Sequence, residues 1–403
     1  MIGPPMDTAE GARAAALRRA VGAAVFVFSV GLPSAAKVLR YAGTPGVVIY
    51  VAVLGAFVGL AGRFDWGGWA ASIAPRRASA VMVMTLLALA MAFVVVYPRV
   101  TSGSDRDEAL DLATRELLHG RFPYYPRAIA TGAVMPAGGG NPISPMPGEL
   151  LLAAPFVLLG GGAWQTFFWL AAFFYVASAV LESRGAGLGA LWSMLVLGPA
   201  ALHEVMTGGD LLANALWVLV LGTLVVGARK GWCGAIAAIA LGVGLSSRAH
   251  FLALVPIVFV VLGVREGWRT ASLRCALAVA AFAIVTLPFY LHDPAAFSPL
   301  HIVGKLGALR PSAPHAVIIA AVLGSAAGAA ALARPGAASV GWALATSAIV
   351  LGVPVIVAVV LACVRDGAIG LEEYAWYAVS SLPFGVLGAM SLLRRPRLPS
   401  ITE

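Results

Sequence analysis

The feature that most constrains how this chain folds is a series of apolar runs that recurs along its whole length. The runs lie near residues 20–36, 44–61, 79–97, 147–160, 163–181, 187–203, 210–227, 232–247, 250–264, 272–290, 313–332, 338–362 and 371–392. About 20 apolar residues are enough for a helix to span a bilayer. Hydrophobic residues make up 60% of the chain and charged residues 11%, compared with about 25% charged in soluble domains. The sequence therefore predicts an all-α, polytopic transmembrane protein with about 12 spans.

The distribution of Lys and Arg predicts which side of the membrane each loop faces, because cytoplasmic loops are rich in both. Arg18 and Arg19 place the amino terminus inside, and Arg394 and Arg395 do the same for the carboxyl terminus. The polar segment 98–146 then lies outside. Arginines at helix ends account for most of the net charge of +9, so this charge does not indicate a nucleic-acid partner.

Two cytoplasmic termini require an even number of spans, whereas the chain has thirteen apolar runs. The basic loops confine the discrepancy to residues 147–227, where four runs must make an odd number of crossings. One of the four is expected to be short, re-entrant or merged with its neighbour. The glycine-rich stretches 160–162 and 185–189 are the expected places for this irregularity.

The predicted organisation follows from these runs and the polar segments between them. The three cysteines have neither the spacing of a disulfide framework nor that of a metal site. The segments are 1–97 with the N-terminal spans, 98–149 as an extracytoplasmic loop, 150–290 as a core transmembrane bundle, 291–312 as a second outer loop, and 313–403 with the C-terminal spans and a short basic tail.

The outer loop 98–149 concentrates charge in an otherwise apolar chain, with six of its 18 acidic residues. Ser104 and Asp107 form a capping-box-like pattern, and an apolar stripe at helical spacing follows. Together they predict a helix over residues 105–118 that lies on the membrane surface. Asp105 and Asp107 have two compatible interpretations. They stabilise the first helical turn, or one acts as a general base while the other orients it or holds a divalent cation.

The loop also carries a longer motif. Residues 105–125 read D-x-D…A-L-D-L-A-x-x-x-L-L-x-G-x-x-P-Y, and residues 140–156 read G-N-P-x-S-P-x-P-G-E-L-L-L-A-A-P-F. This pattern resembles the integral-membrane glycosyltransferases of the GT-C superfamily. It is most similar to glycosyltransferase family 87, the polyprenol-phosphate-mannose-dependent mannosyltransferases and their relatives. Looser matches at 207–214, 245–248 and 265–269 extend the resemblance over roughly residues 80–290.

The resemblance implies a GT-C-like fold and an inverting transfer of a mannose- or arabinose-type sugar to a lipid or glycan acceptor. The donor would be a polyprenyl-phosphate sugar bound at the outer face of a bacterial cytoplasmic membrane, among membrane lipids. Asp105 is the first candidate for the base and Asp107 the second. The two together could hold Mg²⁺ or Mn²⁺, and no other cofactor is expected.

The remaining candidate residues form two groups, those expected to bind the donor phosphate and those expected to bind the acceptor or the sugar. Cationic partners of the leaving phosphate are expected at the outer ends of spans, although basic residues there also extend to lipid headgroups. The phosphate-binding candidates are Arg248, His250, Lys305, Arg310 and His315, with His301 in the same loop. The acceptor- or sugar-binding candidates are Tyr124, Tyr125, Asn141, Glu149, His203, Glu204 and Asp210. Simpler interpretations remain for some of them, since Glu149 could cap a span and the two tyrosines could belong to an interfacial aromatic belt.

Two other function classes remain open from the sequence. A secondary transporter places ionisable residues in mid-span beside broken helices, whereas the acidic residues here concentrate in an outer loop. A surface-polysaccharide ligase or polymerase would also use an outer loop with Arg and His. Its large outer loop is expected late in the chain, however, and this one follows the third apolar run.

Overall fold

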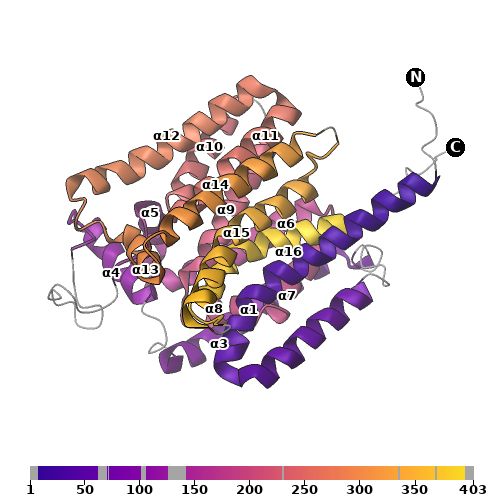
Figure 1. Ribbon diagram of the computed structural model, residues 1–403, viewed down its shortest axis with the longest axis horizontal. Coiled ribbons are helices and arrows are strands. Elements are labelled where there is room, and N and C mark those ends of the chain that lie inside the picture. The colour runs from indigo at the N-terminus through magenta and orange to yellow at the C-terminus, as the bar shows by residue number, and fades with distance from the viewer. Residues whose placement is uncertain are drawn as a thin grey trace.

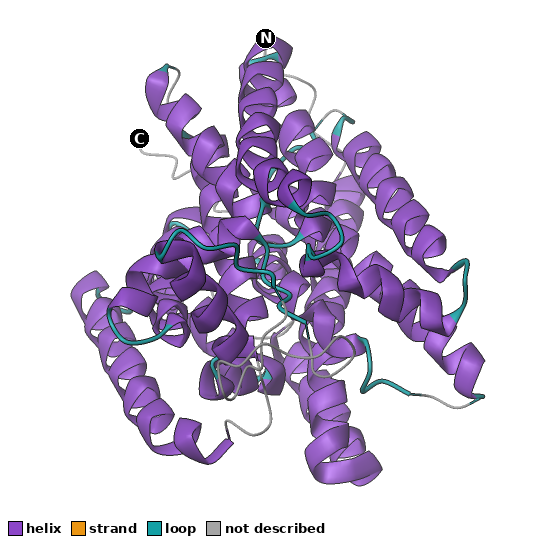
Figure 2. Cartoon of the chain, turned by 90° about the vertical axis from the view of Figure 1, so that its left-hand side faces the viewer, coloured by secondary structure: helices purple, strands orange, loops and turns teal. Residues whose placement is uncertain are grey.

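In the computed structural model the chain is a bundle of helices (Figure 1). The structure describes residues 8–61, 70, 72–100, 106–125, 142–228, 231–334, 336–367 and 370–394, with side chains from residue 12 onward. All regular elements in these ranges are helical (Figure 2). Nine of the described helices are long and apolar enough to cross a membrane. This confirms the prediction of a polytopic all-α membrane protein.

The described helices follow one another along the chain, with the long segment 119–146 between α4 and α5. They are α1 (Thr8–Ala61), α3 (Pro75–Val100), α4 (Arg106–Leu118), α5 (Pro147–Leu158), α6 (Gln165–Val180), α7 (Arg184–Val196), α8 (Pro199–Thr207), α9 (Asp210–Gly227), α10 (Trp232–Leu245), α11 (Val255–Glu266), α12 (Trp268–His292), α13 (His301–Leu309), α14 (Ala313–Leu332), α15 (Val340–Asp366) and α16 (Leu382–Leu393). Four 3₁₀ turns supplement them: η2 (Gly162–Trp164), η3 (Ala249–Leu254), η4 (Ser298–Leu300) and η5 (Ala375–Ser381).

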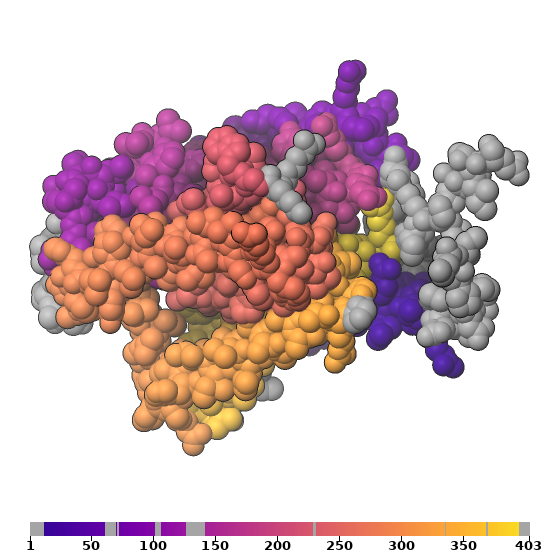
Figure 3. Space-filling view, turned by 90° about the horizontal axis from the view of Figure 1, so that it is seen from above, coloured from indigo at the N-terminus to yellow at the C-terminus, as the bar shows by residue number. Residues whose placement is uncertain are grey.

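The bundle has two distinct ends. Helices α4, α5 and α13 lie together at one end, and the start of α1 and the end of α16 lie at the opposite end (Figure 1). In the space-filling view the purple part of the chain that includes α4 lies at the left, and the indigo start of α1 lies at the right (Figure 3). We call the two ends the α4 end and the terminal end. Connections contributed by distant parts of the chain therefore meet at each end.

The long helix α1 is a hairpin of two antiparallel halves. Gly43 adopts φ 63° and ψ −171°, which interrupts the helix and reverses the chain. The Phe26 and Phe57 rings stack with centroids 5.7 Å apart, and the Tyr50 hydroxyl donates to the Val30 carbonyl at 3.2 Å. These contacts require the halves to lie side by side. The apolar runs 20–36 and 44–61 thus occupy the two arms of one hairpin.

Helix α5 lies along α4 and has both of its ends at the α4 end. At its start, the Gly148 N–H donates to the Ser246 carbonyl at 3.1 Å. Just beyond its end, the Gly162 N–H donates to Asp111 of α4 at 2.6 Å. Between these points Leu150, Ala153 and Val157 of α5 pack in one cluster with residues of α4. The run 147–160 thus forms a helix of 12 residues, shorter than the roughly 20 residues that span a bilayer, and it ends in the glycine stretch 160–162.

A second irregularity lies elsewhere than predicted. The run 187–203 is divided into α7 and α8, whose axes differ by 81°. The break lies at Gly198–Pro199, where proline cannot supply the backbone N–H that continues a helix. The stretch 185–189 lies inside α7 without interruption, so the expectation of an irregularity there was wrong.

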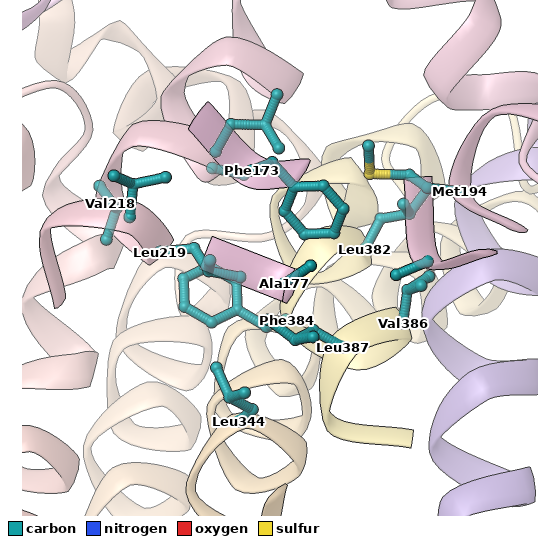
Figure 4. Close-up of a cluster of buried hydrophobic side chains, with 14 of the residues drawn as sticks. Phe173, Ala177, Met194, Val218, Leu219, Leu344, Leu382, Phe384, Val386 and Leu387 are labelled. Carbon is teal, nitrogen blue, oxygen red and sulfur yellow. The ribbon is translucent and has the colours of Figure 1, made fainter. Parts of the chain in front are cut away.

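The apolar core lies around α9, α6 and α16. Along α9 67% of the spanning window is buried, more than along α6. Phe173 and Leu387 are completely buried, and Figure 4 shows them packed with side chains of α7, α9 and α15. Helix α16 approaches its neighbours closely at two glycines. A Cβ at Gly385 would overlap Ser29 of α1, and one at Gly388 would come within 2.6 Å of the Ala345 backbone.

Helix α4 begins at Arg106 and ends at Leu118, within one residue of the predicted limits 105–118. Its apolar stripe is covered by protein, since Leu110 and Ala113 pack with Leu150 of α5 and with Phe297. The predicted contact of this stripe with the membrane surface is therefore replaced by a contact with α5.

Candidate functional site

Four charged side chains from distant parts of the chain meet at the α4 end. Arg106 Nη1 lies 3.2 Å from Asp210 Oδ1, and Arg248 Nη2 bonds the other oxygen of the same carboxylate. Arg248 Nε lies 3.5 Å from Glu149 Oε2, and Arg248 Nη1 donates to the Ser144 carbonyl at 3.0 Å. We call Arg106, Glu149, Asp210 and Arg248 the polar cluster. Two guanidinium groups thus share one buried carboxylate.

Each member of the polar cluster is placed by the start of a helix. Arg106 and Asp210 are the first residues of α4 and α9, Glu149 is in the first turn of α5, and Arg248 precedes η3. Carboxylates at these positions are favoured by the helix dipole, whereas cations are not. The ion pairs with Asp210 and Glu149 compensate the two arginines for this unfavourable position.

The turn between α8 and α9 explains the sequence Thr207-Gly208-Gly209-Asp210. Gly208 has φ 69°, a left-handed conformation that ends α8 and is accessible to glycine without strain. A Cβ at Gly209 would lie 2.5 Å from the Glu204 carboxylate. That carboxylate accepts a hydrogen bond from the Leu211 N–H at 3.1 Å, so Glu204 caps α9. The two glycines therefore let Glu204 and Asp210 occupy adjacent positions at the same helix start.

Aromatic and basic side chains cover the other side of Arg106. The Arg106 guanidinium lies 3.7 Å from the centre of the Trp376 ring, and the Lys37 ammonium lies 5.1 Å from it. Cation–π contacts of this kind favour Arg and Trp. His203 lies next to this group, with its Nε2 atom 3.1 Å from the Tyr41 hydroxyl.

Asp107 is enclosed beside the polar cluster. One of its oxygens accepts a hydrogen bond from the Tyr97 hydroxyl of α3, and only 3% of the residue is exposed. Burial raises the pKa of Asp107 to about 6, although the Tyr97 hydrogen bond opposes the shift. Its position shows that Asp107 attaches α4 to α3. Its role as a base stays a prediction, and Asp105 lies outside the described residues.

The predicted sugar-binding residues take different positions. Tyr124 is 2% exposed and contacts Phe297 edge to face at 5.0 Å. Burial, together with the nearby Glu149 carboxylate, raises the pKa of Tyr124 well above its usual value. Tyr125 is exposed and packs on Phe122. Asn141 lies outside the described residues.

Apart from Arg248, the basic residues predicted near the phosphate occupy three different kinds of position. His301 of α13 lies near the polar cluster: its pKa is lowered by burial and by the positive charges of Lys305, Arg248 and Arg106. Lys305, Arg310 and His315 have exposed side chains. His250 lies two residues after Arg248 with its ring 4.3 Å from that of Phe251.

Several buried polar atoms of the site have no hydrogen-bond partner among the residues that the structure describes. They are the Tyr124 hydroxyl, His250 Nε2, and the Glu149 oxygens and Arg248 Nε, which form an ion pair at 3.5 Å but no hydrogen bond. Unsatisfied buried groups are rare in proteins and require an explanation. Hydroxyl and phosphate groups of a ligand would satisfy acceptors and donors of these kinds.

The described residues contain no group of three or more His, Cys, Asp or Glu that could hold a metal ion. The predicted Asp105–Asp107 cation site includes a residue outside this part of the chain and stays a prediction. Comparison of the chain with protein-family models, with curated proteins and with solved structures finds no match.

Sequence reasoning missed three residues of the site. Arg106 was not among the predicted site residues, although its charge next to a helix start required a partner. Lys37 lies between two apolar runs, and an ionisable residue at such a place is a functional candidate by default. Trp376 has no local signal, because its role depends on a contact 270 positions along the chain from Arg106.

Proposed function

We propose that this chain is an inverting membrane glycosyltransferase that moves a mannose- or arabinose-type sugar from a polyprenyl-phosphate donor to a lipid or glycan acceptor. One observation carries the proposal. The segments that resemble the GT-C enzymes, 105–125, 140–156, 207–214 and 245–248, are far apart in sequence, yet Arg106, Glu149, Asp210 and Arg248 from these four segments contact one another. Four segments that carry the resemblance therefore meet at one end of the bundle.

In the proposed reaction an acceptor hydroxyl oxygen attacks the anomeric carbon from the face opposite the phosphate. The bond between that carbon and the phosphate oxygen breaks, and its electron pair stays on the polyprenyl phosphate. The hydroxyl proton passes to Asp105, the first candidate base. Arg106 and Arg248 are suited to the leaving phosphate, because a guanidinium binds phosphate oxygens in a bidentate manner. Their side chains are 15% and 13% exposed.

We place the α4 end at the outer face of the cytoplasmic membrane. Arg265 and Arg269 lie at the terminal end of α11 and α12, as the positive-inside rule requires of a cytoplasmic face. In this proposal α5 stays at the α4 end, and the crossings in residues 147–227 are α6, the bent pair of α7 and α8, and α9, an odd number. The two arms of α1, α3, α10, α11, α12, α14, α15 and α16 complete twelve spans, in agreement with two cytoplasmic termini.

The test is transfer of radiolabelled sugar from polyprenyl-phosphate mannose, and separately from polyprenyl-phosphate arabinose, by membranes that carry the protein. Asp105→Asn should abolish the label in lipid or glycan products at equal expression. Glu108→Gln is the matched control, because it removes one acidic charge from the exposed face of α4 and should keep the activity. Activity that survives Asp105→Asn and fails in Asp107→Asn would move the base by two residues. Wild-type membranes inactive with both donors, with acceptor lipids supplied, would count against the proposal.

A secondary transporter is the second candidate, and one observation favours it. The 81° bend between α7 and α8 resembles the broken helices that line transport sites, and the buried charges Glu204 and Asp210 follow it. Transport predicts sugar or ion uptake into sealed vesicles that depends on Asp210 and proceeds without any lipid-linked donor. Donor-dependent product formation in leaky membranes would exclude it.

A further inference from the structure

A cavity of about 370 Å³ lies in the bundle apart from the polar cluster. It is lined by α6, α9, α10, α11, α15 and α16, and its volume falls within the range of about 300–1,000 Å³ that is usual for ligand pockets. Its lining extends from Leu245 and Leu254 in the interior to Glu182 and Arg265 at the terminal end.

Packed side chains separate this cavity from the polar cluster. Leu245 is 1% exposed, and Ser246 and Ser247, which connect it to Arg248, are completely buried. The charged residues of the lining, Glu182 and Arg265, both lie at the terminal end. The charged end of this cavity therefore lies at the terminal end, opposite the polar cluster.

The cavity wall is chemically suited to a hydrocarbon chain. Val218, Leu219, Leu344 and Phe384 form part of it and are labelled in Figure 4. The two hydroxyl groups of the lining are already satisfied by their own helices. Thr223 donates to the Leu219 carbonyl at 2.8 Å, and Ser347 donates to that of Ala343 at 2.9 Å. An apolar cavity without free donors or acceptors does not hold ordered water and accepts apolar guests.

The mouth carries one charge of each sign and a strained residue. Glu182 has φ 48°, the one positive φ of a non-glycine residue in the part of the chain that the structure describes. Strain of this kind concentrates at ligand sites. The Glu182 side chain is 72% exposed, with Arg394 at 3.6 Å. Arg394 also donates to the Leu181 carbonyl, and the exposed part of the Glu182 carboxylate remains open to a second cation.

We propose that this cavity binds one acyl chain of a phospholipid whose headgroup carries a phosphate and a primary ammonium group. Arg265 meets the phosphate and Glu182 meets the ammonium. The two opposite charges at the mouth match a zwitterionic headgroup better than a purely anionic one. The proposal is independent of the transferase function, because it concerns the opposite end of the bundle.

The acyl-chain contact is tested by filling the cavity. Gly222 lines it, and a Cβ at Gly222 meets nothing within 4 Å, so Gly222→Leu places a side chain in the empty space. Gly59→Leu is the matched control: its surroundings are equally open, and it lies on α1 outside the cavity. After purification in mild detergent and washing, mass spectrometry should find phosphatidylethanolamine retained by the wild type and Gly59→Leu and largely lost from Gly222→Leu. Val258→Phe, which fills the cavity from α11, guards against a folding defect of the first variant.

The headgroup contact is tested by thermal unfolding of delipidated protein with lipids of identical acyl chains. Phosphatidylethanolamine should raise the Tm more than phosphatidylglycerol, which lacks the ammonium, or phosphatidylcholine, whose ammonium cannot donate a hydrogen bond. Glu182→Gln should remove the preference for phosphatidylethanolamine. Arg265→Gln should reduce the Tm increase caused by each of the three lipids. Equal retention by the wild type and both cavity-filling variants, or the same Tm with all three lipids, would overturn the proposal.

Discussion

At the scale of single residues, Asp210 determines the arrangement of the site. Its carboxylate is completely enclosed and is shared by Arg106 from α4 and Arg248 from the start of η3. Buried ion pairs contribute little net stability as pairs, but removing one partner leaves an uncompensated charge. The cost of a substitution here therefore depends on which charges remain.

Arg248→Gln is expected to destabilise the protein by about 3–5 kcal/mol, because it leaves Asp210 and Glu149 with less positive charge. Arg248→Gln combined with Asp210→Asn should recover part of this loss, since one buried charge of each sign is removed. Denaturant or thermal unfolding in detergent measures the coupling between the two substitutions.

The control is Arg115→Gln, whose exposed pair with Asp111 spans 3.9 Å and should contribute about 0–1 kcal/mol. If the effects of Arg248→Gln and Asp210→Asn on stability are strictly additive, the two side chains do not interact energetically, and this prediction is wrong.

The raised pKa of Asp107 predicts a pH-dependent stability. Its folded pKa of about 6 exceeds the unfolded value of 3.8, so the folded chain binds a proton more tightly. Asp107 then stabilises the fold most below pH about 4, and this stability is lost as the pH rises to about 6. Asp107→Asn keeps the Tyr97 contact without the charge and should flatten the Tm between pH 4 and 6. If the Tm of Asp107→Asn falls with pH as steeply as that of the wild type, other groups cause the pH dependence.

At the scale of elements, the α8–α9 turn presents Glu204 and Asp210 to α4. Gly208 is closely surrounded: its Cβ would lie 3.0 Å from Ala163 and 3.2 Å from both Asp107 and Tyr97. The turn and the first residues of α4 are therefore packed tightly enough that neither can move without the other.

Gly208→Ala and Gly120→Ala separate backbone strain from this close packing. Both glycines have φ near 70°, but Gly120 has open space around it. Gly120→Ala should cost about 1–2 kcal/mol, the penalty of a left-handed conformation, with transferase activity retained. Gly208→Ala should cost more and reduce the activity, because the added methyl group displaces α4. Unfolding and sugar-transfer assays compare the two variants. Equal effects of Gly208→Ala and Gly120→Ala would show that the close packing around Gly208 has no consequence.

At the scale of the whole molecule, the two ends of the bundle should face opposite sides of the membrane. Tyr125 is exposed at the α4 end, and the native Cys233 is exposed at the start of α10, at the terminal end. In a Cys363→Ala background, an impermeant maleimide added to spheroplasts should label Tyr125→Cys directly. It should label Cys233 only after the membrane is permeabilised. The reverse pattern would invert the proposed orientation.

Much of the fold and part of the site could be predicted from local signals in the sequence. The limits of α4 follow from a capping pattern, and the parity of the spans follows from the positions of arginines. Glu149, Asp210 and Arg248 were each recognised as polar residues at helix ends. Their mutual contact was not predicted, because it depends on how α5, α9 and η3 pack, and ridge and groove packing between distant helices has no local pattern. The break at Gly198–Pro199 did have a local signal, which the neighbouring glycines obscured.

The close contact of α1 with α16 has a consequence for how the protein is made. A ribosome completes α1 long before α16, yet Gly22 lies within reach of Ala389 and Leu392, and Gly385 fits against Ser29. Lys37 also enters the membrane long before Trp376, the ring it faces, has been synthesised. The first hairpin must therefore remain inserted beside lipid or another protein until α16 has been synthesised, and only then can the two close contacts form.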